Sequence, residues 1–139
     1  MQFIQTRKTL THQATLAMLS AAVKTAEEMA QPQCIVIVDA SGELLGEIRM
    51  SGAKFLSRKS ARAKALTAAS TGKPSGDLPE AARVPMAAAT GGTVTGLHGG
   101  LPIRIEGDLA GGIGVGSGTG EQDLVVARAA LAAIGADEV

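Results

Sequence analysis

The histidine at position 98 is the residue of this sequence whose type and surroundings most clearly suggest chemistry. His98 directly precedes Gly99 and Gly100, which leave the neighbouring backbone without side chains. Imidazole changes its charge near neutral pH, so it can act as a general acid or base, and it also binds metals. We take His98, Gly99 and Gly100 as candidate site residues, with a histidine on a surface loop as the alternative. The other histidine, His12, falls in the first turn of a predicted helix, where solvent would surround it.

Several cations could hold an anionic group beside this imidazole. Arg58 lies four residues from both Lys54 and Arg62, so the three form one stripe on a predicted helix. Lys64 lies on another face of that helix, and Arg49 lies near the end of a predicted strand. Because Arg and Lys bind carboxylates and phosphates, we take Arg49, Arg58 and Lys64 as candidate ligand-binding residues. The alternative is a solvated basic face, or a contact with an acidic partner.

Two carboxylates complete the candidates. Glu121 falls in the first turn of the last predicted helix, where Thr119 and Gln122 have the spacing of a capping box. The backbone N–H groups at such a helix start can bind an anion. Asp39 follows a strand-like run and would either pair with a cation such as Arg49 or cap a turn.

A glycine-rich run follows these candidates in the chain. Two strand-like segments, residues 101–106 and 109–115, are separated by Gly107 and Asp108, a pair typical of a hairpin turn. The second segment and its end contain Gly111, Gly112, Gly114 and Gly116. Glycine weakens a strand, so these residues indicate either close packing of a helix or an open backbone surface for a ligand. On the second alternative, Gly114 is a candidate ligand-binding residue.

Apolar periodicity predicts the elements that position these residues. Helices are predicted for residues 11–31, 53–70 and 120–134, and further strands for residues 34–38 and 43–50. The first helix carries an apolar stripe of Leu16, Leu19, Val23, Ala26 and Ala30. Residues 77–96 form a less regular segment, in which Pro79–Ala89 could form one or two short helical turns bent at Pro85. This segment would act as a flap over a pocket or as a loosely held connection. Two hairpins joined by helices indicate an α+β fold, with helices packed on a mostly antiparallel sheet.

The length and composition of the chain limit the classes of function that fit it. The 139 residues fit a single domain, residues 1–139, and the formal net charge of zero argues against a nucleic-acid-binding protein. No apolar run reaches the ~18 residues of a membrane span, and the N-terminal residues lack the apolar core of a signal peptide. The single cysteine, Cys34, excludes an intramolecular disulfide, so we expect a cytoplasmic protein. Aromatic residues make up 1% of the chain, so the core uses small side chains and we expect subunit interfaces to add stability.

The sequence resembles the GlcG/HbpS-like haem-degrading family, which is related to the C-terminal domain of PduO corrinoid adenosyltransferases. The similarity rests on CIVIVDASG at 34–42 with RM at 49–50, on SARAKA at 60–65, and on GGLPI at 99–103. It continues through GIGV at 112–115 and EQD at 121–123, and the order and spacing match over about residues 10–135. The resemblance implies a profilin-like fold with a five-stranded antiparallel sheet flanked by helices. It also implies dimers that assemble into larger oligomers, commonly octamers.

Three hypotheses for function follow. In the first, the chain is an oligomeric protein that binds a small molecule, and the family suggests haem or a related tetrapyrrole. The chain has no zinc-site spacing, but a non-covalent haem needs one axial histidine, which would be His98 or His12. In the second, the chain is a catabolic-pathway enzyme, in which His98 acts as general acid or base, cations clamp a substrate carboxylate, and Glu121 or Asp39 orients a neighbouring group. In the third, the basic stripe faces a protein partner.

Overall fold

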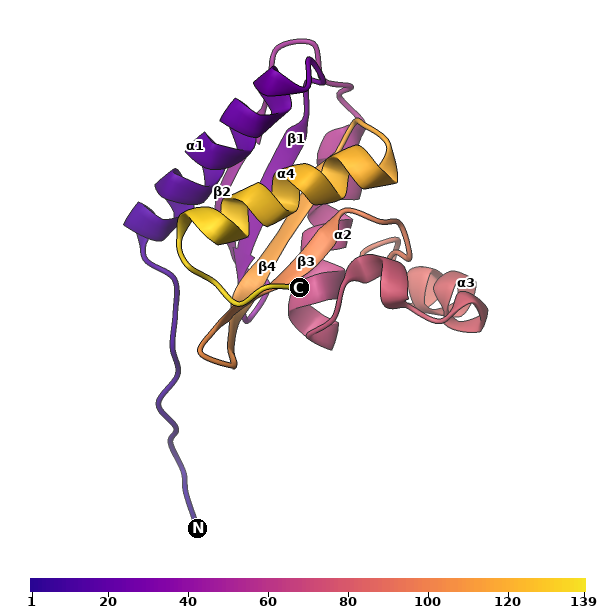
Figure 1. Cartoon of the computed structure of the whole chain (residues 1–139). Coiled ribbons are helices and arrows are strands. Elements are labelled where there is room, and N and C mark those ends of the chain that lie inside the picture. The colour runs from indigo at the N-terminus through magenta and orange to yellow at the C-terminus, as the bar shows by residue number, and fades with distance from the viewer.

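A four-stranded antiparallel sheet lies at the centre of the computed structural model, which describes residues 1–139 (Figure 1). The strands are β1 (Cys34–Asp39), β2 (Leu44–Arg49), β3 (Gly100–Ile105) and β4 (Asp108–Gly116), in the spatial order β2-β1-β4-β3. The helices are α1 (His12–Glu28), α2 (Ser57–Thr71), α3 (Glu80–Ala89) and α4 (Gly120–Ala133), and a 3-10 helix, η1, covers Ser75–Asp77. The predicted α+β class and both predicted hairpins are confirmed.

The family resemblance implied a fifth strand, and this expectation is wrong. The chain after α4 instead runs along the outer edge of β3, where the Asp137 N–H donates to the Arg104 carbonyl at 2.9 Å. The Asp137 carboxylate accepts hydrogen bonds from the N–H groups of Glu106 and Gly107 at the β3–β4 turn. An irregular tail therefore covers this edge in the place where a further strand would pair.

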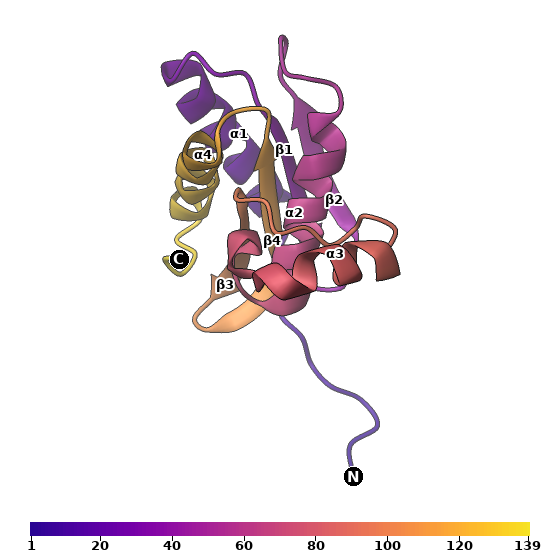
Figure 2. The same ribbon diagram turned by 90° about the vertical axis from the view of Figure 1, so that its right-hand side faces the viewer.

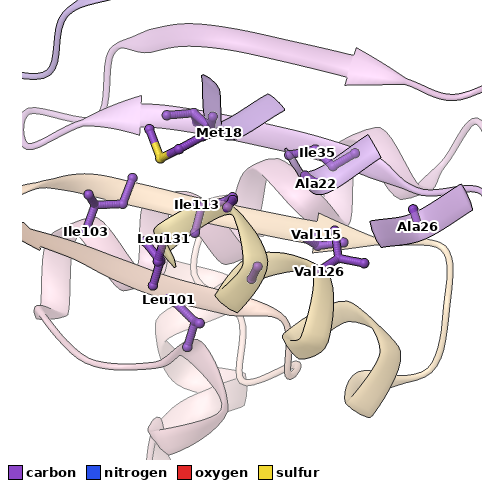
Figure 3. Packing of buried hydrophobic residues seen from close by; sticks show 13 residues of the cluster. Met18, Ala22, Ala26, Ile35, Leu101, Ile103, Ile113, Val115, Val126 and Leu131 are labelled. Carbon is purple, nitrogen blue, oxygen red and sulfur yellow. The ribbon is translucent and has the colours of Figure 1, made fainter. Parts of the chain in front are cut away.

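Helices cover both faces of the sheet (Figure 2). α1 and α4 pack on one face over a core of Met18, Ala22, Ala26, Ile35, Ile37, Leu101, Ile103, Ile113, Val115, Val126, Ala127, Ala130 and Leu131 (Figure 3). α2 packs on the other face over a smaller core of Cys34, Val36, Val38, Ala53, Ala61, Ala65 and Ala69. Successive side chains of a strand point to opposite faces, so β1 is buried on both. This explains its unbroken run of apolar residues.

The glycines of β4 lie where α2 approaches the sheet. A Cβ built on Gly114 would overlap the carbonyl oxygen of Ala61 and would lie 2.6 Å from the backbone nitrogen of Ala65. A Cβ on Gly112 would lie 2.9 Å from the backbone nitrogen of Ala69. The glycine run therefore serves close packing of a helix. The expectation of an open backbone surface at Gly114 is wrong, because α2 covers it.

α1 buries a face that coincides only in part with the predicted apolar stripe, because Ala26 is buried and Leu19 and Val23 pack partly buried against the core. Its buried residues are Thr15, Met18, Ala22 and Ala26. Leu16 is 65% exposed, and Ala30 lies beyond the helix end. A Cβ on Gly46 of β2 would lie 2.7 Å from Cγ2 of Thr15, so the helix approaches the sheet through small residues. This close approach turns Leu16 toward the outer flank of the molecule.

The segment 77–96 contains α3, a helix in the place where the sequence predicted one or two short helical turns. This helix begins after Pro79, includes Pro85 and has no buried residue. It stands apart from the sheet, next to the connection that leads into β3 (Figure 1). Its action as a flap stays a prediction.

Candidate functional site

The imidazole of His98 lies at the surface between two glycines. Its ring packs on Gly76 of η1, where a Cβ would overlap Nδ1 and would lie 2.9 Å from Cγ. On the other side, a Cβ on Gly120, the first residue of α4, would lie 3.0 Å from the His98 Cβ. The His98 side chain is exposed and forms no hydrogen bond within the chain. The two glycines thus leave room for the ring, which packs on Gly76 through its Nδ1 side.

We expect Gly76→Ala to move this ring without unfolding the protein. The added methyl group would overlap Nδ1 and Cε1 of an exposed side chain, which can rotate away at little cost. The histidine ring resonances in an NMR spectrum should shift for His98 and stay unchanged for His12. The midpoint of urea unfolding should change by less than the equivalent of about 1 kcal/mol. Unchanged His98 resonances would mean that Gly76 does not position the ring.

Lys64 lies in the protein interior and is already paired. Its Nζ lies 2.9 Å from Oδ2 of Asp123 and donates a hydrogen bond of 2.8 Å to the carbonyl of Val115. The side chains of Lys64 and Asp123 are only 6% and 2% exposed. This ion pair joins α2, β4 and α4 at one end of the sheet. As a candidate ligand-binding residue, Lys64 is not accessible in the single chain.

The two glycines after His98 pack around this ion pair. Gly99 has a φ of +124°, and a Cβ there would lie 3.0 Å from Lys64 Nζ and 2.6 Å from the Val115 carbonyl oxygen. A Cβ on Gly100 would overlap the Lys64 carbonyl oxygen. Both glycines are buried. They therefore let the chain pass over the ion pair and lead into β3, and they do not present open backbone to a ligand.

A buried polar cluster extends the ion pair toward the start of α4. The Gly118 N–H donates both to Oδ1 of Asp123 at 3.1 Å and to Oε1 of Gln33 at 2.9 Å. Gln33 is fully buried, and its Nε2 has no hydrogen-bond acceptor within the chain. The sequence did not predict that Asp123 and Gln33 form this buried cluster. Only Asp123 belongs to a motif that could have indicated it, as the last residue of EQD at 121–123.

Arg49 and Arg58 do not meet His98. They lie on the β2 side of the molecule, whereas His98 leads into β3 at the opposite edge, about 14 Å away by strand spacing. The Nε of Arg49 donates to the Ala53 carbonyl at 3.2 Å, and Arg58 pairs with Glu47 at 3.2 Å. The structure therefore separates the predicted cations from the imidazole.

The carboxylates Asp39 and Glu121 have different surroundings. Oδ1 of Asp39 accepts hydrogen bonds from the N–H groups of Ser41 and Glu43, so this residue caps the β1–β2 turn and does not pair with Arg49. Glu121 is exposed and directly follows Gly120, which contacts His98. Glu121 is therefore next to a residue that contacts His98, whereas Asp39 lies at the β1–β2 turn. The capping box of α4, formed by Thr119 and Gln122, is confirmed.

A groove that the sequence did not predict ends at Leu97, the residue before His98. It has a volume of about 470 Å³ and is lined by Arg83, Val84, Ala87, Ala88, Val94, Thr95, Gly96 and Leu97. The Arg83 guanidinium donates to the carbonyls of Leu78 and Gly76, and Gly76 is the residue on which the His98 ring packs. Arg83 and the apolar lining of the groove are thus linked to His98 through Gly76 and Leu97. The groove lies between α3 and the connection before β3, and no local sequence pattern predicts that contact.

The structure contains no cluster of three or more His, Cys, Asp and Glu side chains that could hold a metal ion. His12, the first residue of α1, is exposed. Cys34 is buried, and this burial raises the pKa of its thiol, so it is a poor candidate for a metal ligand or a nucleophile. No helix is long and apolar enough to cross a lipid bilayer.

Comparison with known proteins identifies the family. A family model described as "Haem degrading protein HbpS-like" matches residues 10–132, so the chain belongs to the HbpS-like family. It is 39% identical over 129 residues to the corrinoid adenosyltransferase PduO of Citrobacter freundii and 34% identical over 128 residues to that of Salmonella typhimurium. Each match covers 88% of this chain but only 37% of the PduO protein.

Solved structures extend this similarity. The Klebsiella pneumoniae protein ORFY has a TM-score of 0.92 at 28% identity, over 99% of both chains. A structure described as the PduOC:Heme complex has a TM-score of 0.87 at 29% identity, over 94% of this chain and 98% of the other. HbpS has a TM-score of 0.81 at 33% identity, over 94% of this chain and 93% of its own.

Proposed function

We propose that this chain is an oligomeric small-molecule-binding protein of the HbpS-like family whose ligand is haem or a related tetrapyrrole. The observation that carries the proposal is the state of His98. Its imidazole is exposed, is held between Gly76 and Gly120, and forms no hydrogen bond within the chain. The solved haem complex of PduOC, a structural relative, supports haem as the ligand class.

The residues around His98 fit the chemistry of this group. Haem supplies an iron that takes an imidazole nitrogen as an axial ligand, and it carries two propionates on an apolar ring. The His98 ring can offer that nitrogen, and the exposed side chains of Val84 and Leu97 offer an apolar surface in the neighbouring groove. Arg83 stands at the same groove and suits a propionate. Each requirement of the ligand is therefore matched by a residue near His98.

The enzyme hypothesis has less support. It requires Arg49, Arg58 or Lys64 to clamp a substrate carboxylate next to His98. These cations already bind the Ala53 carbonyl, Glu47 and Asp123 respectively. Arg49 and Arg58 also lie on the β2 side of the molecule, away from His98, and Lys64 is buried. The hypothesis of a protein partner still has a surface to rest on, because the basic stripe of Lys54, Arg58 and Arg62 is exposed.

A cytoplasmic location stays a proposal that rests on the single buried cysteine.

Haemin titration tests the proposal. The wild-type protein should give a saturable shift of the Soret band, and His98→Ala should weaken haemin binding by at least about tenfold. His12→Ala is the matched control and should bind haemin as the wild type does. Iron-free protoporphyrin should bind wild type and His98→Ala equally, because it has no metal for the imidazole. The absence of a saturable shift, or equal haemin affinity of wild type and His98→Ala, would contradict the assignment.

A further inference from the structure

The first ten residues form an extended arm whose large apolar side chains are uncovered. Residues 1–10 contain no helix or strand, and the arm points away from the body (Figure 1). Phe3 and Ile4 are 88% and 87% exposed. An exposed apolar pair on an extended segment is costly in water and marks a surface that binds another protein. The arm thus carries side chains that have no partner within its own chain.

Two anchors fix where the arm leaves the body. Arg7 donates to Oγ of Ser41 at 3.0 Å and to the Ala40 carbonyl at 3.1 Å, at the β1–β2 turn. Lys8 forms an ion pair with Asp108 at 2.8 Å, and this hydrogen bond raises the pKa of Lys8 and lowers that of Asp108. Both contacts lie at the turn end of the sheet. Residues 1–6 therefore project beyond that end, and an extended segment of this length reaches up to about 20 Å.

One side of the molecule has exposed apolar side chains and an open strand edge, which suit an extended apolar arm. We call it the β2 flank, and it consists of α1 and β2 with the exposed side chains of Leu16, Leu44 and Ile48. β2 is an edge strand, so its outer backbone N–H and C=O groups are unpaired, whereas the tail with Asp137 covers part of the edge of β3. A groove of about 510 Å³ lies where α1 and β2 end, and its lining mixes apolar residues such as Ile48 with charged ones such as Glu27 and Arg49. An open strand edge with exposed apolar side chains is a typical receptor for an extended peptide.

We propose that the arm of one copy docks through Phe3 and Ile4 on the β2 flank of a second copy. Each chain has one arm and one flank, so two copies satisfy both contacts at once in a closed twofold arrangement. The formal net charge of zero does not oppose this association. This inference rests on the proposed function, which includes an oligomer, and it identifies the contact through which that oligomer would form.

The first test is the mass of the full chain in solution, measured by sedimentation over a range of concentrations. The wild type should form an oligomer, and the double variant Phe3→Asp with Ile4→Asp should weaken self-association at least tenfold. The double variant Gln2→Asp with Gln5→Asp is the matched control, because it adds the same charge to the arm and removes no apolar side chain. It should keep the wild-type mass. An oligomer that is indifferent to both variants would overturn the arm contact alone, whereas a wild-type monomer would also overturn the proposed oligomer.

The second test locates the receiving surface. A photoreactive benzoyl-phenylalanine replaces Phe3, and equal amounts of this protein and of nitrogen-15-labelled wild type are mixed and irradiated. Crosslinks should join the arm of one copy to peptides of α1 or β2 in the labelled copy. Leu16→Asp in the labelled copy should remove most of these crosslinks. Crosslinks confined to the arm's own chain, or to a surface outside the β2 flank, would overturn the proposal.

Discussion

Removal of either partner of the buried ion pair should destabilise the protein by about 3–5 kcal/mol. Asp123→Leu leaves the ammonium of Lys64 in the interior with only the Val115 carbonyl, and Lys64→Met leaves the Asp123 carboxylate with only the Gly118 N–H. A buried charge without its counter-charge has lost most of its compensation for desolvation. Urea unfolding of the two single variants measures the effect.

The double variant Lys64→Met with Asp123→Leu is the control for this interpretation. It removes both charges, so its loss of stability should be clearly smaller than the sum of the two single losses. Additive losses would mean that the two side chains do not interact across the helix interface. Single losses below about 1 kcal/mol would mean that water reaches the pair.

Gly114→Ala should destabilise the fold by about 3 kcal/mol or more, because its new methyl group would overlap backbone atoms of α2. The nearest atoms belong to the Ala61 carbonyl and the Ala65 N–H, which cannot move unless the whole helix shifts. Thermal unfolding followed by circular dichroism measures the loss. Gly116→Ala is the graded control: its Cβ would meet the Ser60 hydroxyl at 3.0 Å, a side-chain atom that can rotate. Equal effects of the two substitutions would contradict the close packing of α2 on Gly114.

The sequence predicted local structure where local chemistry decides it. The β-branched run that became β1, the capping box at Thr119 and the turn at Asp39 each depend on residues within a few positions. Short-range hydrogen bonds and a run of β-branched residues determine such features, so their outcome agrees with the sequence interpretation.

The candidate site was less predictable, because its contacts join distant segments. Lys64 meets Asp123 across a separation of 59 positions, and no local pattern distinguishes this pairing from a solvent-exposed lysine. The glycine run of β4 was compatible with an open surface or with a covering helix, and only the position of α2 decides between them. Arg83 and its groove depend on how α3 lies against the connection before β3, which is a contact between segments that no local pattern predicts.

The buried ion pair and the exposed candidate site are adjacent at His98. The buried ion pair lies against the chain at Gly99, and Gly76 and Gly120 leave room for the adjacent imidazole ring at the surface. A buried support thus carries an exposed side chain that has no partner within the chain. Such a side chain is available to a ligand.

A crystal structure of the protein grown with haemin, with the iron located by anomalous diffraction, tests the central claim most directly. The account predicts iron within bonding distance of a His98 ring nitrogen, with the porphyrin against Leu97 and Val84 and a propionate near Arg83. Iron bound at His12 or elsewhere on the chain, with His98 facing solvent, would contradict it.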